Sequence, residues 1–328
     1  MNFLISSLIV LSCTMAVSAS SWWSLWLFME LGLFWFIPTM VRDSSALQKS
    51  SMWLYFMVQV ISSSFLLVMI VLEEKIMAVA SLHHILSVGM FFCILLKLGM
   101  PPFHSWALLI ADGLPSFSYM VMNTVMKIPP LVMVFNMSYK FSYGVVHLAA
   151  VFGAVVGLGG LTEYSIRRFL LYSSFGSISL SMLGMTNTPT SVWMMLIVYF
   201  VSMWGVISIL KEKWGLSSGL LSSTVSSTKK MLMFTLMLNV MGVPPSLMFF
   251  LKLDIIFGLT QSLGPFPIQY VFLIITSMMA LASVYLILLH FQTLWNGKSY
   301  LEMNNSKTKG VYFILILQIL MSCILFFM

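Results

Sequence analysis

Long apolar runs, separated by short polar stretches, cover most of this 328-residue chain. Most runs are about 20 residues long, which is the length of a helix that crosses a bilayer core of about 30 Å. They fall at about 3–20, 22–41, 53–72, 78–111, 116–137, 144–162, 168–186, 191–210, 231–258, 268–295 and 310–328. The pattern predicts an all-α, polytopic membrane protein with about eleven transmembrane helices. No polar stretch is long enough for a soluble domain, so we expect a single membrane-embedded domain over residues 1–328.

The basic residues are divided unequally between the two sets of loops that these spans define. Loops after even-numbered spans hold eleven of them: Arg42, Lys49, Arg167, Arg168, Lys211, Lys213, Lys229, Lys230, Lys298, Lys307 and Lys309. Loops after odd-numbered spans hold two, Lys75 and Lys140. Because the loops on the cytoplasmic side carry the basic excess in multi-pass proteins, this split supports the count of spans. The N-terminus then faces the cytoplasm or, in a mitochondrion, the matrix, and the C-terminus lies on the opposite side.

Composition narrows the chemistry that this chain can hold. Hydrophobic residues make up 60% of it and charged residues only 8%, against about 25% charged in soluble domains. The net charge of +7 follows from the loop asymmetry, so it predicts no nucleic-acid partner. Cys13, Cys93 and Cys323 are far apart, and the sequence contains neither a phosphate-binding loop nor a dinucleotide fingerprint. We therefore predict no metal site and no cofactor site in this chain.

Two of the runs are too long for a simple crossing, and each contains a Gly-x-Pro-Pro sequence. Residues 98–103 read Leu-Gly-Met-Pro-Pro-Phe, and residues 241–246 read Met-Gly-Val-Pro-Pro-Ser. Proline removes a backbone donor and clashes with the preceding turn, so each pair should open its helix and free carbonyl groups. Broken helices at corresponding places in two halves of a chain are typical of inverted-repeat transporters. We predict an antiporter-like inverted repeat with two proline-broken helices; the alternative is a chance similarity, because Gly and Pro are common in membrane helices.

Four charged residues lie deep inside predicted spans: Glu30, Lys97, Lys127 and Lys252. A charge at the bilayer centre costs about 2.5–3.5 kcal/mol on insertion scales, so four would cost on the order of 10 kcal/mol without partners. Such residues usually mark an ion or proton path. Burial favours a neutral amine and a nearby carboxylate favours an ammonium, so a lysine in this setting can bind and release protons. The alternative is a set of structural ion pairs that only orient helices.

The same positions indicate partners for these charges. Glu30 is the only acidic residue in the middle of a span, and we expect it to pair with Lys97. Lys97 lies four residues before its Pro-Pro pair and Lys252 seven residues after the other, so a freed carbonyl is a second candidate partner for either ammonium. Lys127 precedes a third Pro-Pro pair and lies too deep to reach the interface easily. His104 is either a proton carrier between Lys97 and Lys127 or a packed histidine that donates to a backbone carbonyl.

Five segments, which follow one another along most of the chain, carry a resemblance to a known family. Residues 95–106 read LLKLGMPPFHSW and residues 124–131 read TVMKIPPL. Together with residues 29–38, 159–174 and 238–252, they resemble the broken lysine helices, the early glutamate helix and the Gly-Gly-Leu segment of the antiporter-like subunits of respiratory complex I. The chain departs from the pattern of that family at Ser105, Ala107 and Ser177. These departures bear on the expected water paths and not on the resemblance itself.

The resemblance implies a proton-translocating subunit in the membrane arm of NADH:ubiquinone oxidoreductase. It matches Glu30 and Lys97 to the coupling pair, Lys127 to the connecting lysine and Lys252 to the lysine of the second half-channel. His104 is a further relay candidate because of its position after the first Pro-Pro pair. NADH, FMN, iron–sulfur clusters and ubiquinone would be handled by other subunits. The chain would then be an enzyme only as a part of H+-translocating NADH:ubiquinone reductase.

Location and partners follow from the same resemblance. Eleven spans rather than fourteen match the animal mitochondrial members, which lack three N-terminal helices. The expected place is the mitochondrial inner membrane, with the N-terminus in the matrix and the C-terminus in the intermembrane space. Expected partners are lipids and other membrane-arm subunits, including further antiporter-like chains. Two alternatives stay open: a free-standing cation/proton antiporter, and a structural membrane scaffold whose charges only hold helices together.

Overall fold

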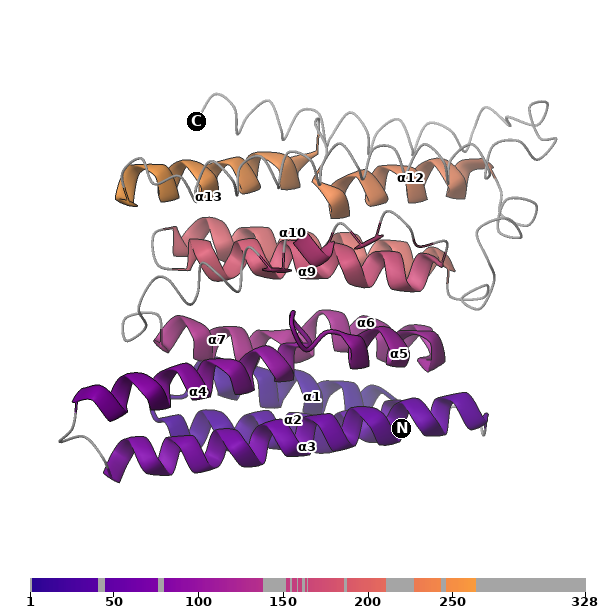
Figure 1. Ribbon diagram of the computed structural model, residues 1–328. Coiled ribbons are helices and arrows are strands. Elements are labelled where there is room, and N and C mark those ends of the chain that lie inside the picture. Colours follow the sequence, from indigo (N-terminus) through magenta and orange to yellow (C-terminus); the bar gives the residue numbers. More distant parts are fainter. Residues whose placement is uncertain are drawn as a thin grey trace. The chain divides into compact units, whose positions relative to one another are not determined.

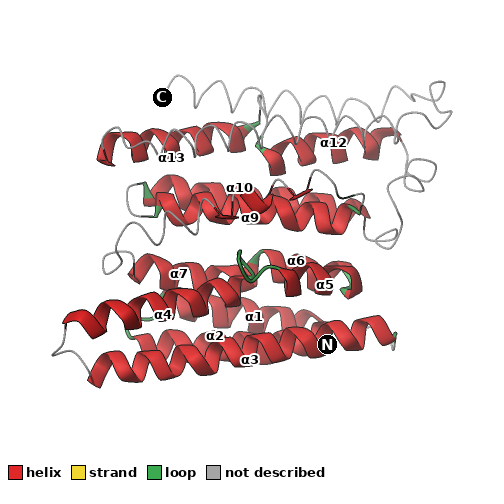
Figure 2. Ribbon diagram, viewed as in Figure 1, coloured by secondary structure: helices red, strands yellow, loops and turns green. Residues whose placement is uncertain are grey.

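Every regular element that the structure describes is a helix (Figure 2). The computed structural model describes residues 2–40, 45–75, 80–137, 165–185, 188–210, 227–242 and 246–263, and short stretches between 152 and 163. The chain divides into two units, Met1–Gly153 and Ala154–Met328. The predicted spans at 268–295 and 310–328, and most of the one at 144–162, lie outside the described residues.

The first unit is built around a layer of long helices. Its described elements are α1 (Asn2–Val17), α2 (Trp22–Met40), α3 (Ala46–Lys75), α4 (Ala80–Leu98), α5 (Ser105–Gly113), α6 (Ser116–Asn123), the 3-10 helix η1 (Val125–Lys127) and α7 (Ile128–Met137). The helices α1, α2 and α3 lie side by side in chain order, and α7 packs against both α1 and α4 (Figure 1). Because these segments are apolar almost all round, they bury one side against each other and expose the rest.

The fourth apolar run forms two helices rather than one. The first, α4, ends at Leu98, and α5 begins at Ser105, with the Pro-Pro pair between them. The uninterrupted helix α3 has 30 residues, which corresponds to about 45 Å at 1.5 Å per residue. It is long enough to contact both α4 and α5, and Figure 1 shows both helices along it. A continuous helix therefore supports the interrupted one.

The second unit repeats this arrangement with different residues. Its described helices are α9 (Ile166–Gly184), α10 (Pro189–Leu210), α12 (Ser227–Met241) and α13 (Leu247–Leu263). The second Gly-x-Pro-Pro sequence separates α12 from α13, and the continuous helix α10 packs against both of them (Figure 1). In both units, a break in one helix is thus bridged by an unbroken neighbour.

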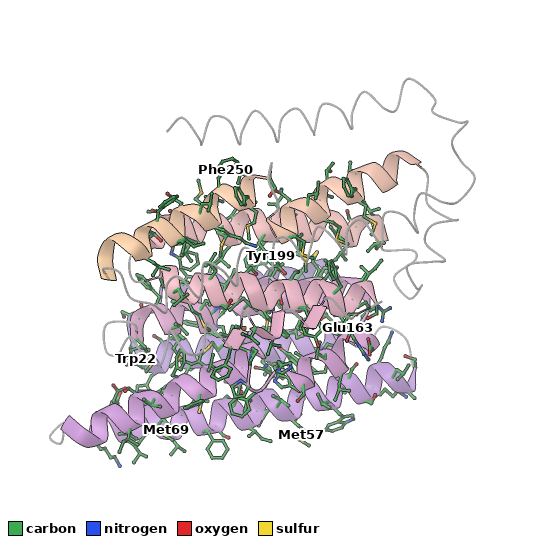
Figure 3. The ribbon with its side chains drawn as sticks, turned by 45° about the horizontal axis from the view of Figure 1, so that its top comes forward. Trp22, Met57, Met69, Glu163, Tyr199 and Phe250 are labelled. Carbon is green, nitrogen blue, oxygen red and sulfur yellow. The ribbon has the colours of Figure 1, made fainter. Side chains whose placement is uncertain are left out.

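Four segments in the described part of the chain are long and apolar enough to cross a membrane. They are Trp22–Met40, Ala46–Lys75, Ser116–Met137 and Pro189–Leu210. On α3, Trp53, Met57 and Phe65 are each more than half exposed, and Figure 3 shows Met57 on the outer side of its unit. An apolar outer face of this kind suits lipid or further membrane helices. The chain is an all-helical, multi-pass membrane protein.

Candidate functional site

Two of the predicted site residues form an ion pair in the first unit. The ammonium nitrogen of Lys97, near the end of α4, lies 2.8 Å from Oε1 of Glu30, in the middle of α2. The Lys97 side chain is 5% exposed and that of Glu30 is 25% exposed. The contact expected from the sequence is present. The charge of a nearly buried lysine is therefore balanced by a carboxylate on a neighbouring helix.

The first helix break is closed by hydrogen bonds of its own last turn. The N–H of Met100 donates to the carbonyl of Leu95 over 2.9 Å, and the N–H of Gly99 to that of Leu96 over 3.2 Å. This pair of bonds is the Schellman ending, in which the residue after the helix takes a left-handed conformation. Gly99 has a φ of 69°, and a Cβ there would lie 3.0 Å from Trp106 Cζ2. The break therefore has a fixed geometry, with Lys97 on the last turn before it.

The carbonyl group of Lys97 is bonded by a side chain from α3. In a continuous helix, this carbonyl would accept the N–H of residue 101, which is a proline and has none. Nε2 of Gln59 donates to it instead, over 3.0 Å. Gln59 is 4% exposed, so the bond is made inside the unit. Sequence reasoning missed Gln59, although an amide within an apolar run and the position of Pro101 were both visible.

The second break places Lys252 on a carbonyl group. Gly242 follows α12 with a φ of 73°, and its N–H donates to the carbonyls of Leu238 and Asn239 over 3.0 and 3.1 Å. The carbonyl of Met241 would normally accept the N–H of residue 245, which is again a proline. The ammonium of Lys252 donates to it over 2.8 Å.

Gly242 is also needed for space at this second break. A Cβ at that position would lie 2.8 Å from the Lys252 ammonium nitrogen and 3.0 Å from Cδ and Cε of the same side chain. Real Cβ atoms essentially never come within 3.0 Å of another heavy atom. The missing side chain therefore lets the lysine reach the end of α12.

Lys127 lies in a third irregular stretch of helix, which comes just before Pro129 and Pro130 in the chain. Thr124 has φ −118° and ψ −80°, and the 3-10 helix η1 follows before α7 begins at Ile128. Pro129 and Pro130 thus fall in the first turn of α7, where their missing N–H groups interrupt no hydrogen bond of α7 itself. Lys127 is 7% exposed.

The carbonyl of Val125, which loses the N–H of Pro129, also has donors. The backbone N–H of Ile128 donates to it, and the thiol of Cys13 on α1 lies 3.5 Å away. Cys13 is buried, with 4% of its surface exposed. The thiol contact was not expected from the sequence.

Two further polar residues near the breaks, His104 and Asp254, make hydrogen bonds with neighbouring helices. His104 lies directly before α5, and its carbonyl accepts the N–H groups of Ala107 and Leu108. Asp254, two residues after Lys252, accepts a hydrogen bond of 2.6 Å from the hydroxyl of Ser191 on α10. The Asp254 carboxylate is therefore bonded to α10.

The arrangement can hold and exchange protons. It combines one carboxylate, buried amines and carbonyl groups released at helix breaks, all of which bind a proton or an ammonium. Among the described residues, no group of three or more His, Cys, Asp and Glu side chains is close enough to hold a metal ion. The chemistry that these residues themselves offer is acid–base chemistry.

Helical bundles with charges at proline-broken helices define a class, the antiporter-like membrane proteins. A family model described as NADH:quinone oxidoreductase/Mrp antiporter, transmembrane, matches residues 19–280. The chain belongs to this family. The resemblance seen in the sequence is confirmed.

Two of its relatives are chain 2 subunits of NADH-ubiquinone oxidoreductase. NADH-ubiquinone oxidoreductase chain 2 of Lumbricus terrestris is 28% identical over 261 residues, which cover 78% of this chain and 77% of the relative. Chain 2 of Cardioderma cor is 27% identical over 293 residues, covering 86% and 82%.

Solved structures share the fold at low identity. A chain of respiratory complex I from Thermus thermophilus with bound aureothin matches with a TM-score of 0.81 at 15% identity, covering 98% of this chain and 77% of that one. A chain of the Mrp complex from Dietzia matches with a TM-score of 0.76 at 14% identity, covering 89% and 59%. The antiporter-like fold of this chain is therefore shared by respiratory and antiporter assemblies.

Proposed function

We propose that this chain is a proton-translocating membrane-arm subunit of NADH:ubiquinone oxidoreductase. The observation that carries the proposal is the Glu30–Lys97 ion pair beside a broken helix. A carboxylate–lysine pair inside a membrane is costly to keep, and such pairs usually serve ion or proton movement. The proposed reaction, oxidation of NADH by ubiquinone, is taken from the names of the chain 2 relatives.

The proposed relay uses four residues and one candidate intermediate. Redox chemistry takes place in other subunits. The change in charge or conformation that it causes separates Glu30 from Lys97. Lys97 then passes its proton to Lys127, directly or through His104 and water. Lys252 exchanges protons with the opposite side of the membrane.

The finer architecture is part of the same proposal. We expect eleven spans, an inverted repeat and one membrane-embedded domain over residues 1–328. The N-terminus would lie in the matrix and the C-terminus in the intermembrane space of a mitochondrion. NADH, FMN, iron–sulfur clusters and ubiquinone would bind to other subunits, and the partners would be further membrane-arm chains and lipids.

A free-standing cation/proton antiporter is the second candidate, and the shared fold of the Mrp complex chain favours it. Native-gel migration of the tagged chain in mild detergent, with in-gel NADH dehydrogenase staining, separates the two functions. Migration with a large NADH-oxidising complex is the result we expect. A small species without that activity would favour the antiporter.

A structural scaffold is the third reading, and it makes an opposite prediction about the ion pair. If the charges only hold helices together, then Glu30→Gln combined with Lys97→Met should restore the activity lost in either single variant, because no unpaired charge is left. The proposed relay predicts that the double variant stays as inactive as Lys97→Met alone. NADH-driven proton translocation by the assembled complex in vesicles measures the difference.

A further inference from the structure

We infer that Gln59 is a positioning residue of the coupling site, which holds the main chain of Lys97 so that its ammonium faces Glu30. The inference rests on the proposed function, because Gln59 has this task only if the Glu30–Lys97 pair takes part in proton transfer. Its side-chain amide donates to the carbonyl of Lys97 over 3.0 Å from a position that is 4% exposed.

The carbonyl of Lys97 needs a donor from outside its own helix. The N–H groups that follow it at Gly99 and Met100 donate to Leu96 and Leu95, and Pro101 has no N–H to give. A buried carbonyl without a donor is unfavourable, so the last turn of α4 would shift to find one. Such a shift would carry the Lys97 side chain with it.

The neutral amide of Gln59 suits this position because it does not disturb the ion pair. At the second break, the ammonium of Lys252 itself bonds the freed carbonyl of Met241. At the first break, an amide makes the equivalent bond, so the ammonium of Lys97 is left to bond Glu30. A cation at position 59 would compete for Glu30, and a carboxylate would compete for Lys97.

The helix that carries Gln59 is also the longest of the helices described in its unit. The 30-residue helix α3 contacts both α4 and α5, on either side of the break. A site held by a rigid element keeps its geometry better than one held by a loop. Gln59 therefore connects the coupling lysine to the part of the unit that spans the break.

The test compares variants in the assembled complex reconstituted in vesicles. Gln59→Met keeps the length of the side chain and removes the donor; we expect assembly to persist and proton-coupled ubiquinone reduction to fall by at least about fivefold. Gln59→His keeps an N–H donor at a similar reach and should recover most of the loss. Ser63→Ala is the matched control, since it removes a buried hydroxyl bond to the Val60 carbonyl on the same helix without touching Lys97.

A double-variant cycle separates positioning from general structural support. In a Glu30→Gln background the pair is already broken, so adding Gln59→Met should cause little further loss. The same fold loss in both backgrounds, or wild-type turnover of Gln59→Met, would overturn the inference. If Gln59→Met does not assemble, Gln59→Asn, which withdraws the amide by one methylene, is expected to show the same pattern.

The outcomes also distinguish this inference from the function on which it rests. Wild-type translocation by Glu30→Gln alone would overturn the proposed relay, and the role of Gln59 would fall with it. Impaired translocation by Glu30→Gln, together with an additive effect of Gln59→Met, would overturn only the role of Gln59.

Discussion

Three carbonyl groups that lose their helical donor to a proline are each bonded by a side chain from another helix. At the scale of single residues, this is the common feature of the candidate site. Gln59 bonds the carbonyl of Lys97, Lys252 that of Met241, and Cys13 approaches that of Val125. The donors differ in chemistry: an amide, an ammonium and a thiol. Only at the second break is the donor itself a proposed proton carrier, so there the protonation of a lysine and the end of a helix depend directly on each other.

The bond from Lys252 to the Met241 carbonyl should depend on the absence of a side chain at Gly242. Gly242→Ala places a Cβ within 2.8 Å of the ammonium nitrogen and on a backbone with φ 73°. We expect the lysine to leave the Met241 carbonyl and proton translocation to fall by about tenfold or more, since small misplacements at a reacting group have large effects. The rate of NADH-driven acidification of vesicles measures it.

Gly89→Ala provides the control for that variant. Gly89 lies within α4, and an added Cβ there meets the end of the flexible Met69 side chain at 3.1 Å. Near-normal translocation is expected. Equal losses in the two variants would show that an added methyl group, and not the position of Lys252, is responsible.

At the scale of helices, each unit pairs an interrupted helix with a continuous one. The pairing is α4 and α5 with α3 in the first unit, and α12 and α13 with α10 in the second. An open helix leaves backbone groups that must be satisfied by protein or water within a membrane. The continuous neighbour supplies the support that lets the break persist at a fixed place.

Among the helices, the 3-10 helix η1 should depend on the missing N–H of Pro129. Pro129→Ala returns an N–H to the position that can bond the carbonyl of Val125, so η1 should convert towards regular helix. The Lys127 side chain would then rotate out of its present direction, and we expect at least about a tenfold fall in translocation with assembly intact.

Pro189→Ala is the matched control for this change. Pro189 is the first residue of α10, where a missing N–H leaves no helical bond unmade. Translocation should stay close to wild type in this variant. A normal rate in Pro129→Ala as well would show that the irregular turn has no part in placing Lys127.

The sequence predicted the helices, both Gly-x-Pro-Pro breaks and the partner of Lys97, because apolar run length and missing N–H groups are local properties. The third Pro-Pro pair begins at Pro129, whereas the irregular turn lies before it, from Thr124 to Lys127. The reason is that the effect of a proline depends on where the next helix starts, which tertiary packing decides. The bond from Gln59 to the Lys97 carbonyl and the close approach of Lys252 to Gly242 were missed, because the two residues of each contact lie on different segments.

At the scale of the whole molecule, the loop charges predict the orientation of the chain. Helix α3 runs unbroken from Ala46 to Lys75 and is long enough for its two ends to emerge on opposite faces of a membrane. We expect Ser45→Cys to be labelled by an impermeant thiol reagent from the matrix side, and Lys75→Cys from the other side. Labelling in right-side-out and inverted vesicles measures this. The reverse pattern would contradict the predicted topology, and labelling of both from one side would contradict a spanning α3.

NADH-driven proton translocation by the assembled complex with Lys127→Met or Lys252→Met shows most directly whether the lysines beside the helix breaks carry protons. Both variants keep much of the side-chain volume and remove the proton-binding amine. We predict complexes that assemble but translocate protons at a small fraction of the wild-type rate, with NADH:ubiquinone turnover lowered as well. Wild-type rates of translocation and turnover in both variants would contradict the relay.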